Sequence, residues 1–490
     1  MERRPFLTAL SGSAPLLAGC TALVDDDPAN ETDDDGTNTE PSTDDDLDRP
    51  DEFDPLSPES DPSVVDFETA PLSAAVVDGR LSTADRLSVV LDFVAPATAE
   101  SPARLGAVLE NRKPFAQTFR PRRLLVLDDP ASGRDDDRNT IYLVPTADNE
   151  LAETVPALER DADGRWRVES VRDDWYPKSI TLGAEERVVL EFAVVGHHDR
   201  SEPPIDAGTY RFSWRDNGFS IAVWPTETPG PTDESRFAGA DVPSIPDTKT
   251  EWYHDAGQRT ETFLRADAET VDTPGRIEFE LVNRARESMS GNPYRWRLYK
   301  LVDDAWIPVY PWEFPLPLAA VTPGESDETE LVLYHGEPVG RQGRTVGHLG
   351  GGRYAYTVGY SLEDETHAAM FEVDAPTLSI GPEPDAEIDR DGDTVVVRLP
   401  NYEDARRPST VTVTRTSSAE ERLIEEQLPR RPFRAFRNTL SLFEEGVEEV
   451  RLETDRSTAL RSLDFDEGET RTIEYDGDAF EATGRVLEEP

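Results

Sequence analysis

Apolar and polar residues alternate along most of the chain after residue 63, which is the pattern of strands that bury one face. The clearest examples are 210–214, 277–281 and 294–298. Turn-forming pairs, Asn217-Gly218 and Pro323-Gly324, separate such stretches. Residues with helical spacing do not appear until after residue 415. The pattern therefore predicts a mainly β fold built from many short strands.

Two long stretches of the chain carry the same elements in the same order. In each, an early strand ends at an asparagine, Asn111 or Asn283, and a Gly-x-Tyr element containing Tyr210 or Tyr354 comes near the end. This Gly-x-Tyr element resembles the corner of many extracellular sandwich domains, including the BsuPI-type proteinase inhibitors. We expect two immunoglobulin-like β-sandwiches, which occupy residues 63–225 and 250–377.

Residues rich in Pro, Gly, Asp and Ser lie between and after these repeats, and they predict exposed linkers over 226–249 and 378–391. The remaining residues, 392–490, mix strand-like and helix-like patterns, which predicts a small α+β domain. Its expected strands are 394–399, 411–414, 450–453 and 470–475. Its expected helices are 419–428 and 433–443.

The N-terminal residues have the character of a removable targeting segment. Two arginines precede an apolar pair and an uncharged stretch that ends in a single cysteine: Arg3, Arg4, Phe6, Leu7, then Leu17, Ala18, Gly19 and Cys20. This arrangement resembles a twin-arginine export signal joined to a lipobox, the lipid-attachment motif of prokaryotic lipoproteins. The resemblance implies removal of residues 1–19 and acylation of the Cys20 sulfur. Cys20 is the chain's one cysteine, so no disulfide or thiolate metal site is expected.

Residues 20–62 are expected to form a disordered acidic tether between the lipid and the first domain. The part from 25 to 62 holds seventeen Asp or Glu and one Arg, with little apolar surface to bury. Repulsion between these charges favours an extended segment. Runs of Asp here also suggest calcium ligands, but no loop of fixed oxygen geometry accompanies them.

The whole chain is strongly acidic, with 101 acidic and 50 basic residues and a formal net charge of −51. Its lysines number four, and all other basic residues are arginines. This composition resembles that of surface lipoproteins of extremely halophilic archaea, in which dense carboxylates keep the protein soluble in concentrated salt. No basic stripe is present to neutralise phosphates, so nucleic acid is not expected as a partner.

One aromatic concentration is a candidate binding surface for a surface protein or a glycan: Trp306, Tyr310, Trp312 and Phe314. Exposed aromatic rings are typical anchors at interfaces. The alternative is that these rings fill the second sandwich core, with the nearby prolines marking an edge strand.

Other motifs do not complete a chemical site. Two adjacent histidines, His197 and His198, would share a metal ion only in a loop, and no third ligand stands at a defined spacing. The run Asp389-x-Asp391-Gly392-Asp393 departs from the EF-hand spacing and predicts a turn. We therefore expect no catalytic residue, no metal and no cofactor.

These features together predict a non-catalytic lipoprotein, anchored through Cys20 to the outer face of the cell membrane, with a binding or scaffolding role. The alternatives are an inhibitor or accessory protein of secreted enzymes, and an enzyme whose site lies in the C-terminal domain.

Overall fold

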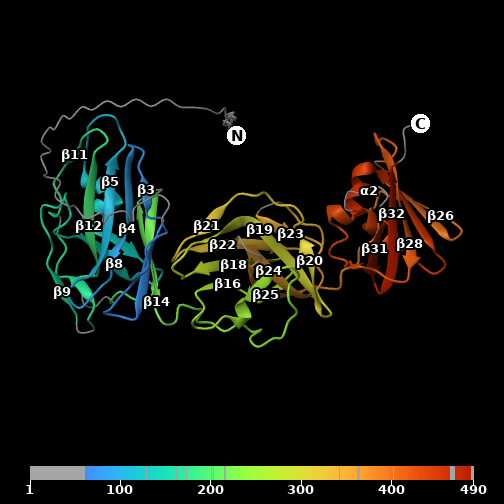
Figure 1. Cartoon of the computed structure of the whole chain (residues 1–490), viewed down its shortest axis with the longest axis horizontal. Helices are drawn as coiled ribbons and strands as arrows, with labels where there is room; N and C mark the ends of the chain where they lie inside the picture. The colour runs from blue at the N-terminus through green and yellow to red at the C-terminus, as the bar shows by residue number, and fades with distance from the viewer. Residues whose placement is uncertain are drawn as a thin grey trace, which may run out of the picture. The chain divides into compact units, whose positions relative to one another are not determined.

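The computed structural model describes most of the chain from residue 61 to residue 486. The gaps within this range are residues 129, 162–163, 173, 200, 202, 215–216, 341–342, 361–364, 401 and 464–469. The predicted export signal, lipobox and Cys20, and the tether up to residue 60, lie outside the described residues. Among the described residues the fold is mainly β, as predicted, and no helix there is long and apolar enough to cross a membrane (Figure 1).

The first β unit covers residues 63–225. Its strands are β1 (Val65–Asp66), β2 (Leu72–Val77), β3 (Arg80–Ser82), β4 (Leu87–Ala95), β5 (Ala103–Asn111), β6 (Gln117–Phe119), β7 (Ala131–Arg134), β8 (Thr140–Pro145), β9 (Leu158–Arg160), β10 (Trp166–Val168), β11 (Ile180–Leu182), β12 (Arg187–Gly196), β13 (Gly208–Trp214) and β14 (Asn217–Pro225). The main sheet has the order β1-β2-β14-β13-β7-β8-β12-β5-β4-β3. Because β8 pairs with both β7 and β12, it joins the two halves of this sheet around one apolar core.

The second β unit covers residues 249–377 and contains two separate sheets. Its strands are β15 (Lys249–Trp252), β16 (Thr262–Ala266), β17 (Thr270–Asp272), β18 (Gly275–Asn283), β19 (Met289–Val302), β20 (Ala305–Tyr310), β21 (Ala319–Val321), β22 (Ser326–Leu333), β23 (Arg344–Val346), β24 (Gly352–Gly359) and β25 (Glu365–Asp374). One sheet has the order β15-β25-β24-β19-β20 and the other β16-β18-β22-β23. Buried rings from both sheets meet in the core, where Phe279 stacks on Tyr356 at 4.1 Å.

The repeated asparagines occupy equivalent positions in the two units. Asn111 ends β5 and Asn283 ends β18, and both side chains are fully buried. Each Nδ2 donates to the carbonyl oxygen four residues further along the chain, at 2.9 Å in both cases. Asn283 Nδ2 also donates to the carbonyl of Val321 at 2.8 Å, and Asn111 Nδ2 also donates to the carbonyls of Leu182 and Gly183. The amide thus fixes the chain reversal after each strand by satisfying buried carbonyl groups.

The repeated tyrosines also make equivalent hydrogen bonds. Tyr210 Oη donates to the carbonyl of Asp206 at 3.0 Å, and Tyr354 Oη donates to the carbonyl of Gly350 at 2.7 Å. Both hydroxyls therefore return to the backbone four residues earlier, which is the geometry of a tyrosine corner.

The C-terminal unit contains one sheet and a few short helices. Its strands are β26 (Glu387–Asp391), β27 (Thr394–Arg398), β28 (Pro408–Thr416), β29 (Glu421–Arg422), β30 (Glu449–Asp455), β31 (Thr470–Tyr475) and β32 (Asp478–Val486), in the order β26-β27-β30-β28-β32-β31-β29. The helices are α1 (Arg434–Arg437) and α2 (Arg456–Ser462). The four predicted strands of this region are present as β27, β28, β30 and β31.

The helix predicted over 419–428 is wrong. Residues 421–422 form β29, and turns follow. The helix-like spacing has another cause, because Leu423 and Leu428 enter the C-terminal core while Ile424 enters the core of the second β unit. The prediction over 433–443 is correct only at α1, with single 3₁₀ turns on both sides at Arg431–Phe433 and Leu440–Leu442.

Both predicted linkers take part in the fold. Phe237 and Ile245, from the segment 226–249, are buried against the outer face of the β15-β25-β24-β19-β20 sheet. The segment 378–391 contains β26, and its Leu378 and Ile380 pack into the C-terminal core. Pro, Gly and Asp gave these segments the composition of linkers, but a few apolar residues in each were enough to dock them.

Candidate functional site

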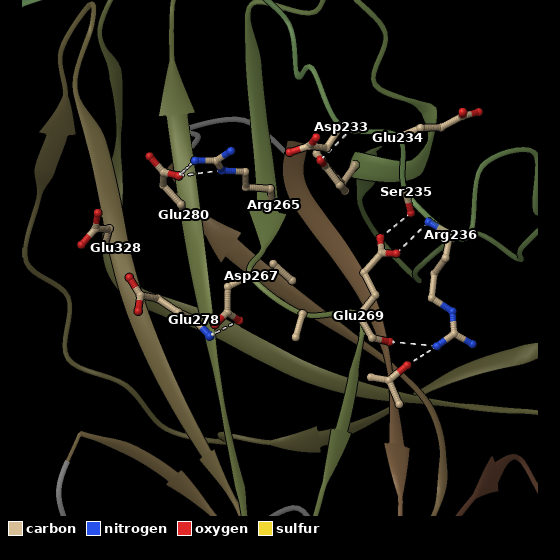
Figure 2. Close-up of a pocket in the computed structure, with 14 residues that line it drawn as sticks. Asp233, Glu234, Ser235, Arg236, Arg265, Asp267, Glu269, Glu278, Glu280 and Glu328 are labelled. Carbon is tan, nitrogen blue, oxygen red and sulfur yellow. Dashed lines mark hydrogen bonds and ion pairs between the residues drawn. The ribbon is translucent and has the colours of Figure 1, made fainter. Parts of the chain in front are cut away.

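An acidic groove of about 790 Å³ lies on the second β unit (Figure 2). One wall comes from the outer face of β18 and β22, and the other from residues 233–236 and the connection between β16 and β17. Its charged lining residues are Asp233, Glu234, Arg236, Arg265, Asp267, Glu269, Glu278, Glu280 and Glu328.

Strand alternation places the carboxylates of the first wall. In β18 the side chains of Ile277, Phe279 and Leu281 enter the core, so Glu278 and Glu280 stand on the outer face. The same alternation places Glu328 on the outer face of β22. The alternation over 277–281 predicted the two faces of β18, but it did not show that β22 is the neighbouring strand.

The pairing of β18 with β22 brings like charges face to face. Glu280 lies directly opposite Glu328, and Glu278 lies directly opposite Glu330. Like charges at opposite positions of an antiparallel pair destabilise a sheet unless a cation lies between them. In this register, the repulsion within each glutamate pair is relieved only by a cation close to the pair.

Arginines satisfy one carboxylate of each pair. Arg265 Nε donates to Glu280 at 2.6 Å, and Arg276 Nη1 donates to Glu330 at 2.8 Å. Glu278 and Glu328, by contrast, form no ion pair with any Lys or Arg of the described residues. Both are exposed, and Figure 2 shows their side chains on the same wall of the groove.

The carboxylates of the second wall hold the backbone in place. Glu269 accepts hydrogen bonds from the Ser235 hydroxyl and from the backbone N–H of Arg236, the latter at 2.7 Å. Asp267 accepts the backbone N–H of Glu278 at 2.8 Å. The Arg236 guanidinium binds Glu372 at 2.6 Å and also the Thr270 hydroxyl. This wall is therefore fixed, and part of it comes from residues that sequence reasoning assigned to a linker.

The groove is suited to cationic groups. Its two arginines are engaged with protein carboxylates, so the side chains available to a ligand are hydrogen-bond acceptors with negative charge. Arginine or lysine side chains of a partner match such acceptors. Within the described ranges, no three His, Cys, Asp or Glu side chains are grouped so that they could hold a metal ion.

The predicted aromatic binding residues lie mainly in internal packing. Trp306 is 2 % exposed, and its Nε1 donates to the carbonyl of Pro243 at 2.9 Å. The Tyr310 ring packs against Trp296, and the Trp312 ring packs edge-on against Phe433 of the C-terminal core. Phe314 is partly exposed. Two strongly exposed apolar residues follow this segment, Leu316 and Leu318, which are 84 % and 72 % exposed.

A buried charged cluster, which the sequence did not reveal, centres on Glu426. This side chain is almost completely buried, and one carboxylate oxygen accepts from Lys300 Nζ, from the Gly350 N–H at 3.1 Å and from Tyr354 Oη at 3.3 Å. Burial, followed by the negative charge of Glu426, raises the pKa of Tyr354 well above its usual value. The cluster is internally satisfied and ties the turn after β29 to the second β unit.

The histidine pair lies at the end of β12. The rings of His197 and His198 stack on each other with centroids 4.2 Å apart, and the Tyr142 ring lies beside them. His197 Nδ1 accepts the backbone N–H of Asp199 at 3.0 Å. These contacts account for the pair as part of a folded turn.

Comparisons with known proteins do not assign a family. No family model and no curated protein matches the sequence. Among solved structures, a polysaccharide lyase is similar at 9 % identity with a TM-score of 0.12, over 61 % of this chain and 35 % of that one. The chain thus spans about a third of the length of that protein. A TM-score of this size carries no argument about fold or function.

Proposed function

We propose that the protein is a non-catalytic binding lipoprotein of the outer cell surface of a halophile, anchored through lipid on Cys20. The twin-arginine and lipobox residues, the acidic tether and the charge of −51 support this location. The two β units, which we assign as immunoglobulin-like sandwiches, supply the binding surface. Their equivalent asparagine and tyrosine hydrogen bonds support that assignment.

The observation that carries the binding role is the pair of carboxylates on adjacent strands, Glu278 and Glu328, which no cation of the described chain neutralises. We infer that the groove receives arginine or lysine side chains of a partner protein. In concentrated salt the Debye length is about 3 Å at 1 M, so only groups in direct contact attract each other. Recognition then depends on hydrogen-bonded contact inside the groove and not on long-range steering.

The test is the binding of a fluorescein-labelled tetra-arginine peptide to the full chain in 2 M KCl, followed by fluorescence anisotropy. Replacing both free carboxylates, E278Q/E328Q, should weaken binding by about tenfold, since turning each charge-assisted hydrogen bond into a neutral one loses about 0.7 kcal/mol, or about 1.4 kcal/mol for the two. The control is D389N/D391N on the exposed strand β26, which removes the same charge elsewhere. Equal losses in both variants would show that net charge, and not the groove, binds the peptide.

A further inference from the structure

The connection between β20 and β21 carries an exposed apolar segment in a protein whose surface is otherwise rich in carboxylates. Leu316 is 84 % exposed and Leu318 is 72 % exposed. Tyr294, on β19, is 49 % exposed. We call these three side chains the apolar patch.

The segment that carries the leucines is held at both ends and along its length. On one side Trp312 packs against Phe433. On the other side β21 pairs with the start of β19, where Ala319 lies opposite Gly291. Between these points Asn292 Nδ2 donates to the carbonyl of Pro315 at 2.7 Å.

The prolines restrict the backbone between these contacts. Pro315 and Pro317 have φ fixed near −65°, and the residue before each proline is confined to extended conformations. Leu316 therefore stands on a stiff backbone and loses little conformational entropy when a surface covers it.

The hydrogen bonds around Asn292 link the backbone at Tyr294 to the segment that carries the leucines. The Asn292 side chain binds Pro315 through Nδ2 and accepts the backbone N–H of Tyr294 through Oδ1, at 2.9 Å. The patch thus combines two aliphatic side chains with a tyrosine, a set that suits the boundary between lipid chains and headgroups.

We propose that the apolar patch docks on the surface of the lipid bilayer that holds the Cys20 anchor. This inference rests on the anchorage in the proposed function. A stable protein interface buries about 800 Å² on each partner, well beyond what three side chains supply. Docking on a bilayer does not require a surface complementary in shape to the patch. The tether would also keep the patch close to the bilayer, which gives the bilayer surface a high effective concentration. Apolar insertion, unlike charge attraction, is not screened by salt.

The experiment uses the full chain carrying Cys20→Ser, so that the patch is measured without the lipid anchor. Its flotation with phosphatidylcholine–phosphatidylglycerol vesicles (1:1) is followed in 2 M KCl. We expect partial co-flotation, and a loss of at least about tenfold in partitioning when L316S/L318S is added. L316M/L318M should retain binding.

The matched control is F115S, because Phe115 is 58 % exposed on the first β unit and lies outside the patch. It should float like its C20S parent. The proposal is overturned if L316S/L318S floats like the parent while folded by circular dichroism, or if the parent itself does not float. The anchor is tested separately in cells, so its failure would not change this result.

Discussion

The Tyr354 hydroxyl lies 3.3 Å from a carboxylate oxygen of Glu426, although 72 positions separate the two residues in the chain. The same hydroxyl closes the tyrosine corner of the second β unit through Gly350. The Glu426 carboxylate therefore reaches the corner from the turn after β29, and Lys300 neutralises it there. In the first unit, Tyr210 makes the corner bond to Asp206.

Substitutions of Lys300 and Glu426 should have strongly non-additive effects on the free energy of unfolding, because the two side chains are only 16 % and 3 % exposed. Replacing Lys300 with Met leaves a buried carboxylate without its cation, which should cost about 3–5 kcal/mol of unfolding free energy. The double variant K300M/E426Q also lacks the buried negative charge of Glu426, so it should recover most of the unfolding free energy that K300M loses. Denaturant unfolding in constant KCl measures both.

The control for this pair is Arg211→Met, which breaks an exposed ion pair with Asp136 whose side chains are 57 % and 88 % exposed. That change should cost no more than about 1 kcal/mol. A K300M variant as stable as R211M would refute the coupling.

Glu383 should make stability depend on pH. Two hydrogen bonds from Arg434, at 2.6 and 2.7 Å, lower the pKa of Glu383 from its usual value of 4.5. Because its pKa is lowered in the folded state, the ionised Glu383 stabilises the fold. This stabilisation is complete above pH 4.5 and is lost as the pH falls through the folded-state pKa. The Glu383→Gln variant should thus be less stable than the parent by about 1–2 kcal/mol at pH 7.

At a pH below the folded-state pKa the two proteins should converge, because protonated glutamic acid resembles glutamine. Denaturant titrations of both proteins across this range provide the measurement. A difference that stays constant with pH would contradict the assigned cause.

High salt should stabilise the folded chain. At a net charge of −51, self-repulsion opposes the compact state at low ionic strength, and added ions screen it. Thermal melts of the full chain should therefore shift to much higher temperature between 0.1 M and multimolar KCl. A melting temperature that does not change with KCl would remove the halophile interpretation.

The local sequence was sufficient to predict strands and which of their faces is buried. In β18, for example, Ile277 and Phe279 enter the core and Glu278 points outward. It also located the repeat through Asn283 and Tyr354. The groove was not predictable in the same way, because it depends on which strands are neighbours and in which register. That information is non-local: Glu280 meets Glu328 only through the pairing of β18 with β22.

Composition was misleading where a few residues decide the packing. Phe237 and Ile245 dock a segment whose Pro and Gly content predicted an exposed linker. The helix-like pattern of Leu423, Ile424 and Leu428 was also misleading, because Ile424 enters a different core from the two leucines. Nothing in the local sequence distinguishes Glu426 from a surface carboxylate, because its partner Lys300 lies 126 positions away.

We propose that the folded units act at the outer cell surface, held there by one lipid-modified residue. The decisive experiment is mass spectrometry of the N-terminal peptide of the native protein, purified from the membrane fraction. We predict a chain that begins at Cys20 and carries the added mass of a glyceride lipid on the sulfur. An unmodified Cys20 still joined to residues 1–19 would contradict the claim.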